Sequence, residues 1–310
     1  MGYGTFDTTA SAARAAFRAA TGTSAFAHDA AARRGEAPCL HPALDVTRKP
    51  YRECRDSADS PTSVPIAVLL DVTGSMGAIP GLVLRELSQL MRMIQGRIVA
   101  YPQILFGAVG DAYCDRVPVQ IGEFEADDER AEAHLANLFL EGGGGGQARE
   151  SYELAMLFFA RQVATDAWEK RGEKGFLFLI GDENYYPTVP RDQAQTFLGA
   201  SLTENVATAT VARELRQRWE VFLIRPGGTS HFENTAIAAS WERILGREQV
   251  LPADDWRMIV PQIAGTIALM AGDNPEAAVN AMIASGFDPR IARTAGRTLS
   301  PHTFRYDSHR

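Results

Sequence analysis

Apolar residues occur in short runs that alternate with amphipathic stretches along most of the chain. Three of these runs are continuous and each ends in aspartate: 66–71 (IAVLLD), 104–111 (ILFGAVGD) and 175–182 (GFLFLIGD). Continuous apolar runs of this length are typical of strands that are buried on both faces of a parallel sheet. Further short strands are predicted at 221–225 (VFLIR) and 249–251.

Between these runs, apolar residues recur at helical spacing. The pattern predicts helices over 79–98, 129–140, 150–168, 206–219, 234–245 and 256–270. Strands that alternate with helices of this length are typical of βαβ units, so we expect an α/β fold: a doubly wound, Rossmann-like, mostly parallel sheet with helices on both faces. The alternating segment 117–124 follows the preceding run too closely for a parallel crossover, which needs about a dozen residues, and therefore predicts an antiparallel edge strand.

This pattern divides the chain into three parts. The α/β domain is expected over 65–272. Residues 1–64 predict a short amphipathic helix at 12–20 and then an extended, proline-rich connector that runs over the surface. Residues 273–310 predict a short extension with two helices, which begins directly after the domain.

Composition narrows the class of protein. The 310 residues carry a formal net charge of −7, which argues against a nucleic-acid partner held by bulk electrostatics. The longest apolar runs are far shorter than the roughly 20 residues that span a bilayer, so no membrane association is expected. The three cysteines are too scattered for a disulfide framework or a zinc knuckle, and they fit a reducing cytosol. We therefore predict a cytoplasmic protein.

Candidate chemistry lies where the apolar runs end. Asp71, Asp111 and Asp182 close three predicted parallel strands, whose carboxyl ends should meet at one edge of the sheet. Crowded carboxylates repel one another and raise their pKa values unless a cation compensates. Oxygen ligands without histidine or cysteine favour Mg²⁺, with Mn²⁺ or Ca²⁺ as alternatives, over zinc.

The first run continues as Asp-Val-Thr-Gly-Ser-Met over 71–76. Spacing of two would place Asp71, Thr73 and Ser75 side by side on a tight turn, so that one carboxylate and two hydroxyls point at one spot. Neutral hydroxyls leave a bound ion much of its charge, and Mg²⁺ usually keeps a position for an outside ligand. Such a site suits the holding of an acidic partner. Alternatively, the two hydroxyls only cap the next helix.

An apolar strand followed by DVTGSM and a helix resembles the metal-ion-dependent adhesion site of von Willebrand factor A domains, whose first motif is D-x-S/T-x-S. The resemblance covers about 65–272 and extends to uncharacterised bacterial proteins that carry this domain. It implies an Mg²⁺ site with Thr73 and Ser75 as direct ligands, and with Asp71 and Asp182 nearby, partly through water. The family's loop threonine has no clean counterpart, because the loop reads GGGGGQARES over 142–151.

Further residues are expected around the predicted metal site and at its contact with a partner. Residues expected around the metal are Asp111, Gln147, Glu150 and Glu183, and those expected to contact a partner are Gly145, Tyr185 and Tyr186. We predict a non-enzymatic, metal-dependent protein-binding or adaptor module. The resemblance suggests a protein partner such as a MoxR-type AAA+ ATPase. The alternatives are a metal-dependent phosphohydrolase or nuclease that uses the same carboxylate crevice, and a structural subunit.

Overall fold

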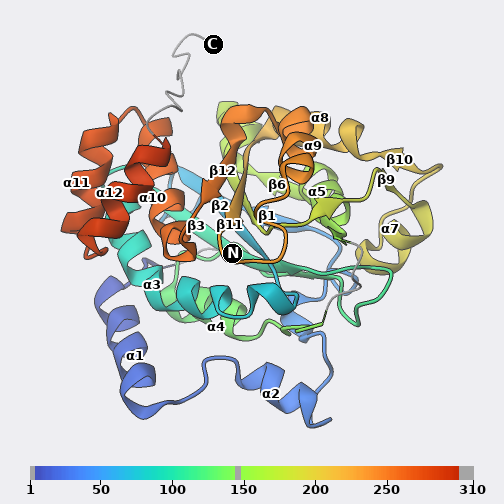
Figure 1. Cartoon of the computed structure of the whole chain (residues 1–310), viewed down its shortest axis with the longest axis horizontal. Coiled ribbons are helices and arrows are strands. Elements are labelled where there is room, and N and C mark those ends of the chain that lie inside the picture. The colour runs from blue at the N-terminus through green and yellow to red at the C-terminus, as the bar shows by residue number, and fades with distance from the viewer. Residues whose placement is uncertain (1–3, 144–147, 300–310) are drawn as a thin grey trace.

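A six-stranded, mostly parallel sheet forms the centre of the protein (Figure 1). The computed structural model describes residues 4–143 and 148–299 of the chain. The strand order is β12-β11-β7-β2-β3-β4, and β4 alone in this sheet runs antiparallel to its neighbour. The strands are β2 (Ser63–Asp71), β3 (Tyr101–Val109), β4 (Val119–Ile121), β7 (Gly175–Ile180), β11 (Trp219–Pro226) and β12 (Val250–Ala253). The predicted doubly wound α/β fold with one antiparallel edge strand is confirmed.

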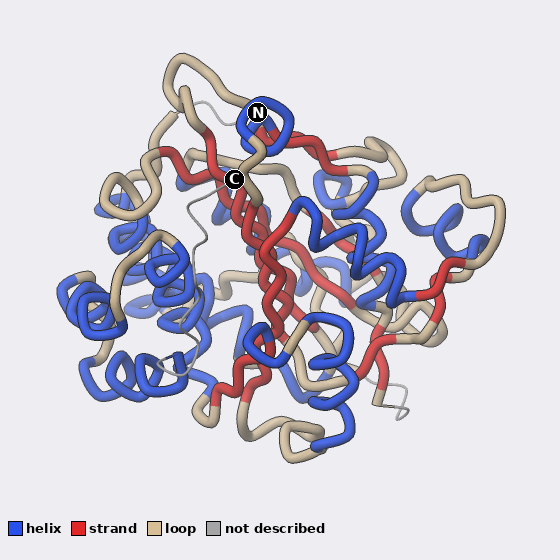
Figure 2. Tube along the Cα trace, turned by 90° about the horizontal axis from the view of Figure 1, so that it is seen from above, coloured by secondary structure: helices blue, strands red, loops and turns tan. Residues whose placement is uncertain are grey.

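Helices cover both faces of this sheet, as the view along its edge in Figure 2 shows. Alternate residues of β2 enter two separate cores, because successive side chains of a strand point to opposite faces. Ile66, Val68 and Leu70 pack with the helices on one face, whereas Ala67 and Leu69 pack with those on the other. The first face carries α3 (Ile79–Ile94), α4 (Asp128–Ala136) and α10 (Ile259–Met270), and the second carries α5 (Tyr152–Arg161), α8 (Thr208–Arg218) and α9 (Thr235–Leu245).

The helix predicted over 150–168 is wrong, since the segment is broken in the middle. The break is the strand β6 (Val163–Thr165), which separates α5 from α6 (Asp166–Arg171). Two β-branched residues favour the extended conformation there, and the Thr165 hydroxyl accepts a hydrogen bond from the Trp168 amide to start a new helix. Local capping therefore overrides the apolar periodicity.

The connector predicted to run over the surface is partly buried instead. Its segment β1 (Arg52–Cys54) pairs in parallel with β6. The Arg52 side chain is 1% exposed and donates hydrogen bonds of 2.7 Å to the carbonyl oxygens of Ile121 and Gly122. These bonds satisfy a buried guanidinium and tie the connector to the edge of the sheet.

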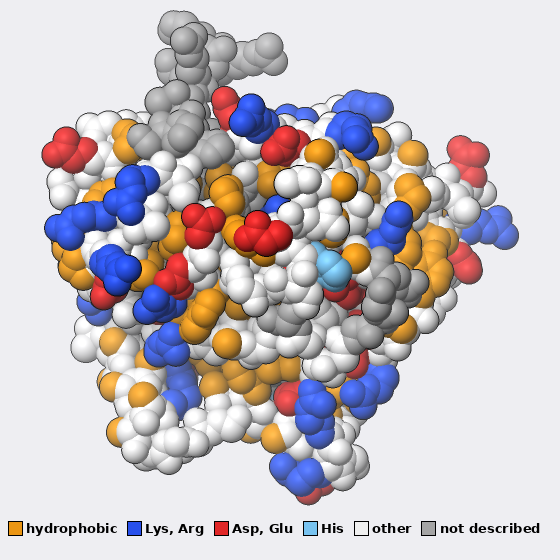
Figure 3. All heavy atoms as spheres, in the orientation of Figure 1, with side chains coloured by type: hydrophobic (Ala, Val, Ile, Leu, Met, Phe, Trp, Pro, Cys, Tyr) orange, Lys and Arg blue, Asp and Glu red, His pale blue; other side chains and the backbone are white. Residues whose placement is uncertain are grey.

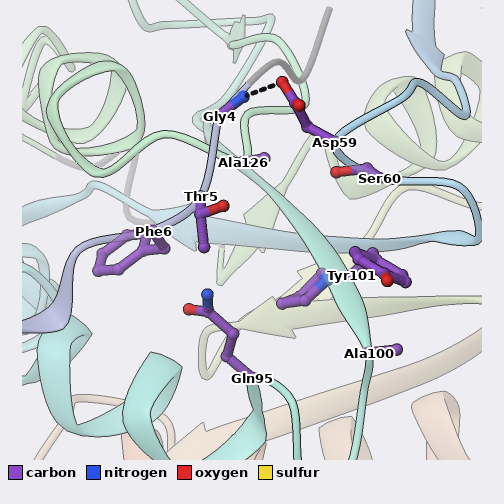
Figure 4. A pocket seen from close by; sticks show the side chains of 10 residues that line it. Gly4, Thr5, Phe6, Asp59, Ser60, Gln95, Ala100, Tyr101 and Ala126 are labelled. Carbon is purple, nitrogen blue, oxygen red and sulfur yellow. Dashed lines mark hydrogen bonds between the residues drawn. The ribbon is translucent and has the colours of Figure 1, made fainter.

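The N-terminal and C-terminal segments are helical. The helix expected at 12–20 is longer, and α1 (Thr8–Thr21) begins at an Asp7 cap. Residues 4–6, which precede it, line a small pocket together with Asp59 and Tyr101 (Figure 4). The pattern did not predict α2 (Ala27–Arg33) or α7 (Arg191–Leu198). Both expected C-terminal helices, α11 (Pro275–Ala284) and α12 (Pro289–Leu299), contribute to the core around α3 and α10. On the face drawn in Figure 3, basic side chains over the α11–α12 region are interspersed with acidic ones.

Several short elements complete the described chain. The strand pairs are β5 (Arg149–Glu150) with β8 (Asn184–Tyr185), and β9 (Thr188–Val189) with β10 (Val206–Ala207). The 3₁₀ turns are Pro42–Leu44, Gly74–Met76, Arg247–Gln249 and Trp256–Met258. Within the described ranges, no helix combines the length and the apolar character needed to cross a membrane.

Candidate functional site

Three buried aspartates lie where parallel strands end. Asp71 is the last residue of β2, while Asp111 and Asp182 follow β3 and β7 by two residues, and none of the three is exposed. The strands are neighbours in the order β7-β2-β3, so the aspartates share one edge of the sheet, as the sequence predicts. The chain leaves β2 toward β3 on one side and later returns to β7 on the other. Such a switch point is where open α/β sheets form their sites.

Asp71 is fixed by hydrogen bonds from two directions. Its Oδ1 accepts from the Thr73 amide at 2.9 Å and from the Thr73 hydroxyl at 2.6 Å. Its Oδ2 accepts from the Tyr152 hydroxyl at 3.1 Å. Although Thr73 precedes the 3₁₀ turn Gly74–Met76, its hydroxyl does not cap that turn. The capping alternative is therefore not realised at Thr73, while the side chain of Ser75 lies outside the described part of the structure.

The turn after Asp71 is attached to the glycine-rich loop. The Gly142 amide donates to the Val72 carbonyl oxygen at 3.2 Å, and the Gly74 amide donates to the Gly143 carbonyl oxygen at 2.8 Å. Two expected site residues of this loop, Gly145 and Gln147, lie outside the described residues. The described start of the loop thus forms one wall beside the Asp71 turn.

Asp182 holds an oxygen without a partner. Its Oδ2 accepts from the His231 amide at 2.6 Å, but its Oδ1 is buried and has no hydrogen bond among the described residues. Burial raises the pKa of Asp71 to about 6, and the negative charge of Asp182 adds to that rise. The two carboxylates are therefore close enough to repel each other, and a buried acceptor oxygen is left unsatisfied.

More acidic groups surround this pair. Burial raises the pKa of Glu150 to about 11, with the charges of Asp71 and Glu183 contributing, and one Glu150 oxygen is buried without a partner. Burial also raises the pKa of Glu183 to about 7, again with help from Asp71 and Asp182. Among the described residues, the one neighbouring buried cation that acts on this group is the Arg225 guanidinium, which interacts with the charge of Asp182. This edge of the described structure therefore carries several buried acids against a single buried cation.

These carboxylates do not form a complete metal centre by themselves. Across the part of the chain that the structure describes, no three histidine, cysteine, aspartate or glutamate side chains are grouped closely enough to hold an ion. A cation at this edge would need hydroxyl, carbonyl or water oxygens in addition. The hydroxyl of Thr73 next to Asp71 is one such oxygen, and a site of this kind suits Mg²⁺, which usually keeps several waters.

Asp111 and the tyrosines form a separate group at the same edge. The Tyr186 hydroxyl donates to both Asp111 oxygens, at 3.0 and 3.1 Å, and burial raises the pKa of that hydroxyl. Tyr113, which is 56% exposed, packs against the Tyr186 ring at an angle of 48°, with 4.6 Å between centroids. Asp111 thus holds the aromatic loop in place.

Tyr185, which the sequence predicts to contact a partner, turns its ring inward. It is 9% exposed, its ring meets that of Trp241 at 4.9 Å, and its hydroxyl donates to the Ser240 carbonyl oxygen at 3.2 Å. Successive side chains of a strand point to opposite sides, so only one of two neighbouring residues faces inward. On β8 (Asn184–Tyr185) the residue that faces inward is Tyr185. Tyr186 is half-buried, and Tyr113 is the exposed aromatic residue of this group.

Sequence reasoning missed two buried residues at this edge of the sheet. Tyr152 begins α5 inside a segment with purely helical periodicity, and nothing in that pattern indicates its contact with Asp71. Glu153 is fully buried and accepts a 3.1 Å hydrogen bond from the Tyr186 amide. The one available signal was Glu153 directly before the apolar residues 154–160 of α5, since glutamate is rarely buried without a partner.

Comparisons with known proteins do not assign the chain to a family. No family model matches the chain, and no curated protein matches it either. Two solved structures of the pilus adhesin SpaC from Lactobacillus rhamnosus GG, one in an open conformation, are similar at 12% identity, with TM-scores of 0.46 and 0.47. The match covers 70% of this chain but only 32% and 31% of the adhesin. Proximal thread matrix protein 1 from the mussel byssus is similar at 11% identity and a TM-score of 0.43, over 71% of this chain and 49% of that protein. Likeness at this level says nothing of function, so the site itself has to supply the evidence.

Proposed function

We propose that the protein is a divalent-metal-dependent binding module that takes an acidic side chain of a partner protein. In this proposal Asp71, Thr73 and Asp182 hold Mg²⁺ together with water, and Ser75 joins them as its place in the motif suggests. The observation that carries the proposal is the Oδ1 atom of Asp182, which is buried without a hydrogen-bond partner beside the repelling carboxylate of Asp71. A divalent cation would bind the unsatisfied Asp182 oxygen and would also neutralise the repulsion between the two carboxylates.

The donor set is compatible with this ion. A hydroxyl that donates its hydrogen to a carboxylate keeps its lone pairs for a cation, and the Thr73 hydroxyl donates to Asp71. Two carboxylates and neutral oxygens suit a hard cation such as Mg²⁺, with Mn²⁺ and Ca²⁺ as alternatives. Bound there, Mg²⁺ would offer a coordination position to a carboxylate from outside. Because both Asp71 oxygens already accept hydrogen bonds and both aspartates are buried, we favour binding over hydrolysis.

The partner in this proposal is a protein that presents an exposed aspartate or glutamate. Resemblance to bacterial von Willebrand factor A proteins makes a MoxR-type AAA+ ATPase of the cytoplasm the first partner to test. The rim of the site would include the start of the glycine-rich loop and Tyr186, since both lie at the edge where Asp71 and Asp182 are found.

The experiment is a thermal-unfolding titration with Mg²⁺, Mn²⁺ and Ca²⁺ on the wild type, Thr73→Val and Asp182→Asn. Ligand at about 100 times its Kd adds roughly 2.7 kcal/mol of stability. We expect a saturable rise in the wild type that both variants lose. Asp192→Asn, an exposed aspartate on α7, is the matched control and should keep the rise.

Two outcomes would contradict the proposal. One is a wild type that no divalent ion stabilises. The other is Mn²⁺-dependent hydrolysis of p-nitrophenyl phosphate that disappears in Asp71→Ala, because it would establish a phosphohydrolase at the same residues.

A further inference from the structure

The hydroxyl of Tyr152 reaches Asp71 through a slot that a glycine leaves open. Tyr152 is fully buried at the first position of α5. A Cβ atom placed on Gly181 would lie 1.8 Å from the Tyr152 hydroxyl oxygen and 3.0 Å from the Cβ of Asp71. Any side chain at position 181 would therefore displace the hydroxyl or the aspartate.

Gly181 is required for space and not for its backbone conformation. It is absent from the described glycines with positive φ, so another residue could adopt its dihedral angles. Its amide donates to the Ile224 carbonyl oxygen on β11 at 3.1 Å, which prevents the backbone from moving away. The contact of Tyr152 with Asp71 thus depends on Gly181, which follows β7 and directly precedes Asp182.

The Tyr152 ring is also fixed by a contact with a second aromatic ring. It packs edge-on against Trp241 of α9, with 5.2 Å between centroids and an angle of 83°. The Trp241 indole nitrogen donates to the Glu183 carbonyl oxygen at 2.9 Å, in the loop that carries Asp182. Tyr152 is therefore connected to Asp71 through its hydroxyl, and to the loop after β7 through its ring contact with Trp241.

We propose that Tyr152 is a positioning residue for the metal site: its hydroxyl fixes the Oδ2 atom of Asp71, so that Oδ1 stays bound to Thr73 and the Thr73 oxygen stays turned to the cation. This inference rests on the proposed metal-binding function. With Oδ1 held by Thr73 and Oδ2 held by Tyr152, the carboxylate has no freedom to rotate about its terminal bond. Groups that orient metal ligands in this way typically change metal affinity by roughly 10- to 100-fold.

The test compares Tyr152→Phe with Tyr185→Phe in the full chain. Both substitutions remove one hydroxyl from a buried or nearly buried ring that packs against Trp241, but the Tyr185 hydroxyl bonds to Ser240 and not to Asp71. Isothermal titration with Mg²⁺ should show binding weakened by roughly 10- to 100-fold in Tyr152→Phe and unchanged in Tyr185→Phe. The electron paramagnetic resonance spectrum of bound Mn²⁺ should change in the first variant alone.

The outcomes separate this inference from the function on which it rests. If the wild type binds Mg²⁺ and Tyr152→Phe binds it equally well, the positioning role is refuted and the metal site stands. Equal weakening in both variants also refutes it, because the effect would then come from general loosening around Trp241. If the wild type binds no divalent ion, the proposed function fails and the inference fails with it. Should Tyr152→Phe not fold, Gly181→Ala serves instead, because its Cβ would meet the Tyr152 hydroxyl at 1.8 Å and the Asp71 Cβ only at 3.0 Å. Unchanged Mg²⁺ binding in Gly181→Ala would then refute the inference.

Discussion

Asp71→Asn should make the metal-free protein more stable while it abolishes stabilisation by Mg²⁺. Asparagine keeps the shape of aspartate, and its oxygen still accepts the bonds that Thr73 donates to Asp71. Its amide group can bond to the Tyr152 oxygen, since a phenol both donates and accepts. What the substitution removes is a negative charge that is buried beside Asp182.

The size of the gain follows from the pKa of Asp71. Burial, with the charge of Asp182 adding to it, raises that pKa from 3.8 to about 6. One pKa unit corresponds to about 1.4 kcal/mol, so the full penalty is about 3 kcal/mol. The folded protein binds this proton more tightly than the unfolded chain does, so the free energy of unfolding falls as pH rises from about 4 to about 6. Above that interval the penalty is complete.

Urea unfolding, followed by circular dichroism, measures both effects. Without metal, the free energy of unfolding of Asp71→Asn should exceed that of the wild type by about 3 kcal/mol at pH 7.5 and by less at pH 5, where the penalty is only partly developed. Saturating Mg²⁺ at pH 7.5 should stabilise the wild type and leave the variant unchanged. Glu150 and Glu183 titrate in the same protein, so the quantity compared is the difference between variant and wild type at each pH. A variant that is less stable than the wild type at pH 7.5, or a difference that does not grow with pH, would refute the reasoning.

Three further predictions concern the surroundings of the site. Burial raises the pKa of Glu153 to about 8, so the stability advantage of Glu153→Gln should grow by about 1.4 kcal/mol per pH unit between pH 5 and 8 in urea unfolding, and a constant difference would contradict it. Gly181→Ala should cost about 1–3 kcal/mol in the wild type and less in Tyr152→Phe, whereas equal costs in a double-mutant cycle would disprove the contact. Asp29 of α2 accepts a 3.0 Å hydrogen bond from the Leu140 amide and pairs with Arg33, whose guanidinium donates to the Leu140 carbonyl oxygen. Asp29→Asn removes the ion pair with Arg33 and should therefore speed hydrogen exchange at the Gly142 and Gly74 amides. The expected cost in stability is below about 1 kcal/mol. Unchanged exchange at both amides would show that α2 does not hold this loop.

The sheet could be predicted because its signal is local and strong. The continuous apolar runs that became β2, β3 and β7 are typical of strands buried on both faces of a parallel sheet. The gap before β4 is too short for a parallel crossover, so it predicts an antiparallel return. Once strand direction is known, the place of Asp71 and Asp182 at one edge follows without any structure. Fold and edge are thus consequences of periodicity and chain length.

Side-chain partners could not be predicted, because they depend on distances across the fold. The contact of Tyr152 with Asp71 joins residues 81 positions apart, and it exists only because Gly181 of another strand end lacks a side chain. The inward position of Tyr185 depends on the pairing of β8 with β5, a two-residue strand below the reach of pattern analysis. The break at β6 has a local cause, its β-branched residues and the Thr165 cap, but its pairing with β1 in the connector depends on the fold.

Several unfavourable features of the protein lie together at one edge of the sheet, and this grouping favours a ligand site over a structural role. Some buried acids elsewhere are paired, as Asp128 and Glu132 are with Arg14 between α1 and α4, whereas Glu86 and Glu125 each keep a buried oxygen without a hydrogen bond in the described part of the chain. At the carboxyl edge two such acids, Asp182 and Glu150, lie in one group with Asp71, and the pKa values of Asp71 and Glu150 are raised. Folding alone gains nothing from acids that are buried in mutual repulsion, because apolar residues of similar volume would pack there at lower cost. Proteins depart from the rules of stable folding mainly at their functional sites. Here the departure is a group of buried acids, and a bound cation would compensate their charge.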